Sequence, residues 1–258
     1  MLTKPIEMKD KRNIYKLLGV ELKNVSKEKV LDKIIKNIES SRTFCHIVSV
    51  NPENLVIANS NRIFRKIVET AQIQIIDGVG VVIAGRMNNL KLEKITGVDL
   101  MNDLIELASR MRLRVLLIGG KDNLALKLAD CYSVKYSKAK FIGIEGIKDI
   151  KKPSKKEEKG ISSIVTAYKP HLVFVAFGSP HQEIWIERHK NIFKKTVVMG
   201  VGGSFDLLSG RIARAPKAVR KLGFEWFFRL LIEPWRWRRQ LRLIKFSYLV
   251  LKEKWKNS

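Results

Sequence analysis

The chain has 258 residues, of which 45% are hydrophobic, so it can bury a substantial core in one large domain or in one domain with an appendage. This apolar content excludes a globally disordered chain. Fifty lysines and arginines face 25 acidic residues, and the formal net charge is +25. Such an excess of cations favours anionic partners, namely nucleic acid, phosphorylated small molecules or an acidic membrane surface.

The cysteine spacing and the length of the apolar runs further restrict the possible classes of protein. Cys45 and Cys131 lack the spacing of a zinc site or a disulfide framework, and we expect two buried thiols. The N-terminal residues have no apolar segment of the signal-peptide type. No window approaches the roughly 18 apolar residues that span a bilayer. We therefore expect a cytoplasmic protein that can adhere to a surface.

The first elements alternate between strand and helix patterns. Residues 1–18 are polar and basic, and we expect them to form a flexible arm. Residues 19–25 alternate like a short strand, and Ser26 stands where a helix N-cap belongs. Buried-strand runs follow at 44–50 and 73–77, with a helical pattern between them.

From residue 113 the alternation of strands and helices is regular. The helical patterns cover 122–136, the segment around Ile161 and Val165, and 182–193. Apolar strand runs occupy residues 114–120, 139–146, 171–180 and 195–203. This order predicts an α/β fold, a mostly parallel sheet with helices on both faces, over residues 19–210.

In such a fold ligands bind beyond the carboxyl ends of the strands. Five turns are expected to line one crevice there: Ser49–Asn51, Asp77–Gly78, Gly119–Lys121, Gly178–Pro180 and Gly200–Asp206. The glycines of the stretch VMGVGGSFD (198–206) let a ligand approach the backbone, whose amides can hold an anion. The dinucleotide fingerprint is incomplete, and no P-loop or DxD pattern occurs. The four histidines, His46, His171, His181 and His189, lack metal-ligand spacing, so we expect no metal site.

Several motifs, taken together and in order, resemble one family. They are IIDGVGVV, EKITGVDLM, FGSPHQE, MGVGGSFDLLSG, RAPKAVRKLGFEWFFRL and EPWRWRRQLR. From about Gly19 to near the C-terminus the chain is similar to the WecG/TagA/CpsF glycosyltransferases. The resemblance implies a Rossmann-like core and inverting transfer, without metal or cofactor, of an N-acetylmannosamine-type sugar. It implies a UDP-sugar donor and a polyprenyl-diphosphate-linked acceptor in cell-surface polysaccharide synthesis of the teichoic-acid type.

The resemblance also assigns roles to residues of this sequence. Asp77 lies where the family's proposed catalytic base does, although on sequence alone a turn-capping role is about as plausible. Asp206 is the alternative base, with bracing of the glycine loop as its other role. Asn51 matches the family's strand end, and Ser49 stands where the family usually has Thr. Lys94 replaces the Arg of the family's ERVxGxDL motif and loses bidentate geometry.

The leaving UDP gains negative charge, which without a metal requires cationic groups or amides. The amides of Gly200, Gly202 and Gly203 are candidates, and Gln182 matches a family amide suited to bind a sugar or base edge. A helix N-terminal polar residue is the alternative role of Gln182. In the tail, Arg229, Arg236 and Arg239 match arginines that the family is thought to fold over the site.

The tail itself, residues 211–258, is strongly basic and aromatic. It holds fourteen Lys and Arg against three Glu, together with Trp226, Trp235, Trp237 and Trp255. A helical face carries Leu241, Ile244, Tyr248 and Leu251. We expect a basic amphipathic appendage that associates with an anionic membrane surface on the cytoplasmic face. A helix packed on its own core is the alternative.

A second class of function stays open at this stage. Arginine and tryptophan together also suit phosphate contacts and base stacking, so a basic nucleic-acid-binding protein with an α/β core is the alternative hypothesis. No RRM, KH or helix-turn-helix signature is evident, and nucleic acid is not the expected partner. The sequence leaves open whether the protein forms an oligomer.

Overall fold

The computed structural model describes residues 14–41 and 43–256 and is built around a six-stranded sheet of order β4-β3-β8-β7-β5-β6. Every neighbouring pair in this sheet is parallel. The strands are β3 (Cys45–Val50), β4 (Ile73–Ile76), β5 (Arg114–Gly119), β6 (Lys140–Ile144), β7 (Leu172–Ala176) and β8 (Val197–Gly200). The predicted α/β fold with a parallel sheet is confirmed.

Helices cover both faces of the sheet because the buried side chains of each strand alternate in direction. On β3, Cys45 and Ile47 join the core against α1, α5 and α6, whereas Val48 and Val50 join the core against α2, α3 and α4. A third cluster packs α7 and α8 on the second face. The bounds are α1 (Lys27–Lys36), α2 (Pro52–Ser60), α3 (Arg62–Thr70), α4 (Val79–Met87), α5 (Gly97–Arg110), α6 (Leu124–Lys135), α7 (Lys155–Tyr168) and α8 (His181–Arg188), with a short π-helix η2 (Asn37–Ser41) and a short 3-10 helix η3 (Lys190–Phe193).

The arm predicted for residues 1–18 is wrong at its C-terminal end. Residues 14–17 form β1 (Ile14–Leu17), which pairs antiparallel with β2 (Val20–Lys23) in a separate hairpin. Leu17 and Leu18 are buried in the core beside α2 and α3, and this burial outweighs the polar composition around them. Residues 1–13 lie outside the described part of the chain. A smaller correction is that Cys131 is exposed, while Cys45 is buried as expected.

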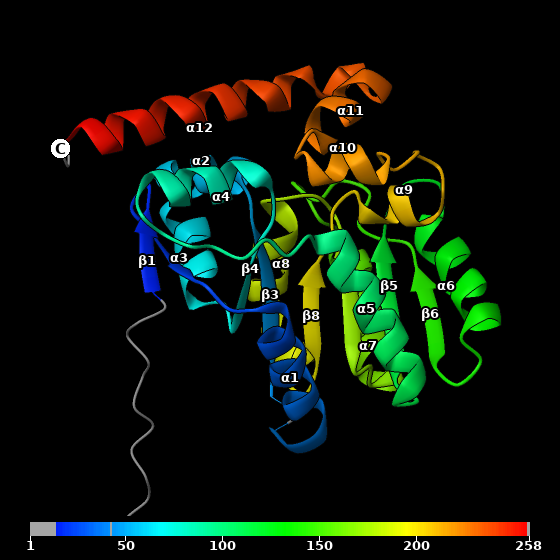
Figure 1. Cartoon of the computed structure of the whole chain (residues 1–258). Coiled ribbons are helices and arrows are strands. Elements are labelled where there is room, and N and C mark those ends of the chain that lie inside the picture. Colours follow the sequence, from blue (N-terminus) through cyan, green and yellow to red (C-terminus); the bar gives the residue numbers. More distant parts are fainter. Residues whose placement is uncertain (1–13, 42, 257–258) are drawn as a thin grey trace, which may run out of the picture.

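The C-terminal segment crosses the edge at which the strands end (Figure 1). It consists of α9 (Ser204–Leu208), α10 (Lys217–Lys221), α11 (Glu225–Ile232), η4 (Pro234–Arg236) and α12 (Trp237–Lys256). In α12, Phe246 and Val250 are buried in the same cluster as Leu55 and Val81. The carboxylate Oε2 of Glu253 also accepts a hydrogen bond from the backbone N–H of Leu18, at 3.0 Å. The last helix is therefore packed on the core.

The opposite side of α12 is apolar as well, and it is uncovered. The exposed fractions are 53% for Leu241, 67% for Ile244, 60% for Tyr248 and 51% for Leu251. These are the residues that the sequence places on one helical face. Trp226, Trp235, Trp237 and Trp255 are exposed on the same C-terminal segment. Within residues 14–41 and 43–256, no helix is both long and apolar enough to cross a membrane.

Candidate active site

The strand-end turns predicted to form a crevice lie along one edge of the sheet. Asp77 follows β4, Ser49 and Asn51 end β3, and the glycine loop Gly200–Gly203 follows β8. Because these three strands are neighbours and run parallel, their carboxyl ends meet. The turns after β7 and β5 continue the same edge on the far side of β8. The C-terminal helices α10–α12 lie above this edge (Figure 1).

Backbone contacts on two sides hold Asp77 in place. Its N–H donates to the carbonyl of Val50 at 2.7 Å, which continues the β3–β4 pairing by one residue. Its Oδ2 accepts from the N–H of Gly97 at 3.2 Å, at the first residue of α5. Gly97 leaves little room here, since a Cβ on it would lie 3.4 Å from Oδ2 of Asp77 and 3.3 Å from Oγ of Ser49. The start of α5 therefore packs directly on the acid.

The pKa of Asp77 is raised to about 6, mainly by burial, with a smaller contribution in the same direction from the nearby carboxylate of Glu225, while the Gly97 hydrogen bond and Lys94 oppose the shift. A carboxylate with a pKa near 6 is ionised at neutral pH and is a stronger base than an ordinary aspartate. The charge of Glu225 reaches Asp77 from α11, so the C-terminal segment forms part of the electrostatic environment of this acid. Sequence reasoning did not find Glu225 or Gly97, although Gly97 lies within the EKITGVDLM motif.

Gln182 connects two of the glycine turns. Its Oε1 accepts from the N–H of Gly178 at 3.0 Å and from the N–H of Gly202 at 3.1 Å. Gly200 has no room for a side chain, because a Cβ there would lie 2.6 Å from Nε2 of Gln182. The side chain is 4% exposed, so its amide serves inside the protein to hold the β7 and β8 turns together. Direct contact of Gln182 with a substrate stays a prediction.

A buried polar network that the sequence did not reveal continues from Gln182. Nε2 of Gln182 donates to Oε1 of Glu183 at 2.8 Å, which fixes the orientation of the amide. Burial raises the pKa of Glu183, and the hydrogen bond from Gln182 opposes this shift. Asn54 joins the turns after β7 and β3, since its Oδ1 accepts from Ser179 and its Nδ2 donates to the carbonyl of Ser49, both at 2.8 Å. Asn51 caps α2 by accepting from the N–H of Asn54.

Arg229 lies over the glycine loop. A Cβ on Gly203 would lie 3.2 Å from a terminal nitrogen of Arg229, and the side chain is 17% exposed. The guanidinium is held at 3.1 Å by Glu233, the residue that caps the C-terminus of α11. Asp206, the alternative base, lies in the first turn of α9 and is 3.8 Å from Arg211. The structure therefore joins Arg229 to Gly203, two predicted site residues that are far apart in the sequence.

The other predicted tail arginines are placed differently. Arg239 pairs with Glu53 of α2 at 3.2 Å, and Arg242 pairs with the same carboxylate. Because Glu53 follows Asn51 by two residues, this contact clamps α12 to the rim of the site. The side chain of Arg236 lies outside the described part of the chain. Lys94 is exposed, and its backbone forms a bridge with Ile76, beside Asp77.

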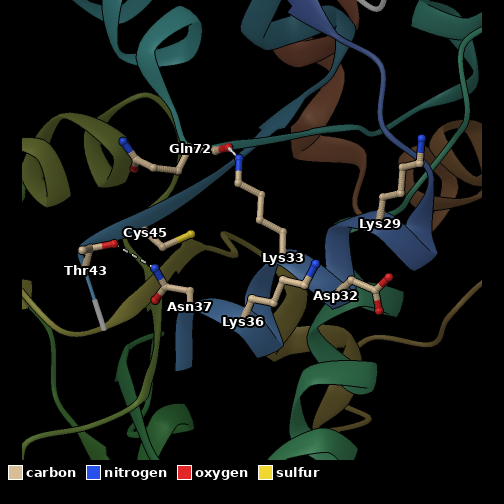
Figure 2. Close-up of a pocket in the computed structure, with 8 residues that line it drawn as sticks. All are labelled: Lys29, Asp32, Lys33, Lys36, Asn37, Thr43, Cys45 and Gln72. Carbon is tan, nitrogen blue, oxygen red and sulfur yellow. Dashed lines mark hydrogen bonds between the residues drawn. The ribbon is translucent and has the colours of Figure 1, made fainter. Parts of the chain in front are cut away.

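A pocket of about 450 Å³ lies away from the predicted site residues (Figure 2). It borders Cys45, the first residue of β3, and so lies at the opposite edge of the sheet from Asp77. Lys33 spans it and donates to the carbonyl of Gln72 at 2.6 Å. Asn37 and Thr43 are hydrogen-bonded to each other at 2.9 Å. None of the predicted site residues lines this pocket.

Within residues 14–41 and 43–256, no group of three or more His, Cys, Asp or Glu side chains is arranged to hold a metal ion. His46 is buried at the other end of β3 from the site, and His189 stacks on Trp185. The expectation that transfer needs no metal stays a prediction.

A parallel α/β sheet with glycine turns, an arginine over them and a half-buried carboxylate at a strand end are features of enzymes that transfer groups from phosphorylated ligands. Residues 15–258 match the family described as "Glycosyl transferase WecG/TagA/CpsF family". The chain belongs to this family and is a glycosyltransferase.

Curated relatives include the N-acetylglucosaminyldiphosphoundecaprenol N-acetyl-beta-D-mannosaminyltransferases of three bacteria. The Bacillus subtilis enzyme is 32% identical over 86% of this chain and 85% of its own length. The Bacillus spizizenii enzyme is 34% identical over 80% and 78%. The Staphylococcus aureus enzyme (strain NCTC 8325) is 31% identical over 92% of each chain.

Proposed function

We propose that this protein transfers N-acetylmannosamine from a UDP-sugar to N-acetylglucosaminyl-diphospho-undecaprenol, a linkage step in teichoic-acid-like polymer synthesis. The names of the curated relatives support this acceptor and this sugar. The observation that carries the proposal is Asp77, a carboxylate with a raised pKa held at a strand end, on the same edge of the sheet as the loop that Arg229 covers.

In the proposed reaction Asp77 accepts the proton of the acceptor hydroxyl as that oxygen attacks the anomeric carbon. The bond between the anomeric carbon and the UDP oxygen breaks, and UDP leaves with its electron pair. Arg229 and the backbone amides of the glycine loop stabilise the charge that develops on UDP. Gln182 keeps these amides in place through its bonds to Gly178 and Gly202. No divalent metal takes part.

Nucleic-acid binding by the basic tail finds less support. Two of its arginines, Arg239 and Arg242, are paired with Glu53, and Arg214 is paired with Asp99. These cations hold the tail on the core, and their guanidinium groups are partly neutralised before any nucleic acid could bind.

The direct test is a donor screen with a short-chain lipid diphosphate carrying N-acetylglucosamine, followed by mass spectrometry of the product. We expect addition of one N-acetylhexosamine from UDP-N-acetylmannosamine, with little product from UDP-N-acetylglucosamine. The rate should be the same with EDTA. Loss of activity in EDTA with recovery on adding Mg²⁺ would refute the metal-free mechanism, and absence of product with every donor would refute the proposed function.

We further propose that the protein binds peripherally to the cytoplasmic face of the membrane through the outer face of α12. This face presents Leu241, Ile244, Tyr248 and Leu251 to solvent on a strongly basic helix. Apolar side chains can enter the lipid interface while lysines and arginines attract anionic headgroups.

The variant Ile244→Asp should weaken binding to phosphatidylglycerol vesicles by roughly tenfold or more, because one apolar side chain no longer enters the interface and an acid is added. Wild-type binding should also weaken as salt rises. Val134→Asp is the matched control, since Val134 is 86% exposed on α6, away from α12, and this variant should bind like the wild type. Equal binding by both variants would contradict a role of this face.

A further inference from the structure

A second cavity lies beside Asp77, between the core and the C-terminal segment. It has a volume of about 160 Å³ and is lined in part by Lys27, Lys94, Arg214 and Arg220, with Asp99 and Glu225 on its wall. These residues come from the start of α1, the segment before α5, α5 itself, α10 with its preceding loop, and α11. The cavity exists only because the tail is folded onto the core.

The cations of this cavity exceed its acids. Arg214 pairs with Asp99 at 2.7 Å and lies 3.8 Å from Glu225, so one arginine forms ion pairs with both acids, and the charge of Arg220 also lowers the pKa of Asp99. Burial raises the pKa of Asp99, but the hydrogen bonds from Thr96 and Arg214 outweigh this and hold the pKa below its ordinary value. Asp99 is thus an anion that stays paired with Arg214.

Two cations remain for a ligand. Within the described ranges, neither Lys94 nor Arg220 has an ion-pair partner, while Lys27 pairs with Asp103 at 2.7 Å outside the cavity lining. Nε of Arg220 donates to the carbonyl of Ala215 at 3.0 Å, which holds the guanidinium in place. A partly enclosed cavity with two unpaired cations favours a ligand with more than one negative charge.

We propose that this cavity binds the diphosphate of the lipid-linked acceptor; the inference rests on the proposed function. A diphosphate could also come from the nucleotide donor. The glycine turns after β8, β7 and β5 are suited to bind the donor. In the sheet these three strands lie on one side of β3, and β4, which leads to Asp77, lies on the other side. The cavity lies on the Asp77 side, where Lys94, Asp99 and Glu225 all influence the pKa of that acid.

The apolar surface nearby fits a lipid tail better than a nucleotide. Leu222 and Phe224, in the turn between α10 and α11, are 71% and 53% exposed, and Phe227 of α11 is 46% exposed. An acceptor whose diphosphate lies between Lys94 and Arg220 would present its sugar toward Asp77 and its chain toward these side chains.

The test compares Arg220→Gln, Arg220→Lys and Lys217→Gln with the wild type. Lys217 is exposed on α10 and does not line the cavity, so it controls for loss of one positive charge from the same helix. We expect Arg220→Gln to raise the acceptor KM about tenfold or more and to leave the UDP-sugar KM within about twofold. Arg220→Lys should recover part of the loss, and Lys217→Gln should behave like the wild type.

Binding measured by calorimetry separates the two sources of diphosphate without any turnover. Geranyl diphosphate should bind the wild type and lose affinity in Arg220→Gln, whereas UDP should bind both proteins equally. If Arg220→Gln weakens the binding of UDP instead of geranyl diphosphate, the cavity belongs to the donor. If it changes the binding of neither ligand, the cavity residues form an internal ion network. Either result overturns the proposal. If the wild type transfers no sugar but binds geranyl diphosphate through Arg220, the proposed function fails and the anion site stands.

Discussion

Replacing Asp77 by Asn is expected to lower kcat by about 10²–10⁴-fold while UDP binding is retained, because Asn cannot accept the proton of the acceptor hydroxyl. The amide can still accept the hydrogen bond from Gly97, so the start of α5 keeps its place. Steady-state kinetics together with UDP calorimetry measure both effects. Near wild-type turnover of Asp77→Asn would move the base role elsewhere, with Asp206→Asn as the next variant to measure.

The pH dependence supplies the control for this assignment. The pKa of Asp77 is raised to about 6, so the base loses its charge as the pH falls through 6, and wild-type kcat/KM should fall with it. As the pH falls, protonation of Asp77 lowers activity but increases the stability of the fold. Because the folded protein binds this proton more tightly than the unfolded chain does, ionised Asp77 destabilises the fold above pH 6. Asp77→Asn should therefore be at least as stable as the wild type at pH 7.5.

Replacing Arg229 by Gln is expected to lower kcat by about 10²–10³-fold, the size seen when a group that stabilises transition-state charge is removed. The reason is the position of the guanidinium against Gly203, where the diphosphate of the donor is expected to lie. Arg238→Gln is the matched control, because Arg238 is an exposed tail arginine beside the ring of Trp237. That variant should keep full turnover.

Arg229 also holds the buried Glu233, so a fall in turnover has to be separated from a loss of fold. Thermal unfolding of Arg229→Gln measures the structural part, and Arg229→Lys, which keeps a charge without the two-pronged guanidinium, should recover part of the activity. If Arg229→Gln folds normally and keeps full turnover, the tail serves only to anchor the protein.

The sequence by itself determined the class of fold, because short apolar runs such as 172–177 and 197–201, each followed by glycine, are typical of strands covered on both faces. It also determined that Ser49, Asp77 and the Gly200–Gly203 loop share one edge. This follows from topology, since parallel strands bring their carboxyl ends together however far apart they are in the chain.

Only the tertiary structure decided which distant parts of the chain contact the predicted site residues. The hairpin strand β1 was missed because its polar segment is stabilised by burial of Leu17 and Leu18 against distant helices. The contacts of Gly97 with Asp77, Arg229 with Gly203, and Glu53 with Arg239 join segments 20, 26 and 186 residues apart. No local sequence pattern encodes these contacts. The amphipathic period of a helix shows which of its faces is apolar, but it does not show which part of the protein that face packs against. For α12 this decided the outcome: one apolar face is packed on the core, and the other, with Ile244 and Tyr248, is left to solvent.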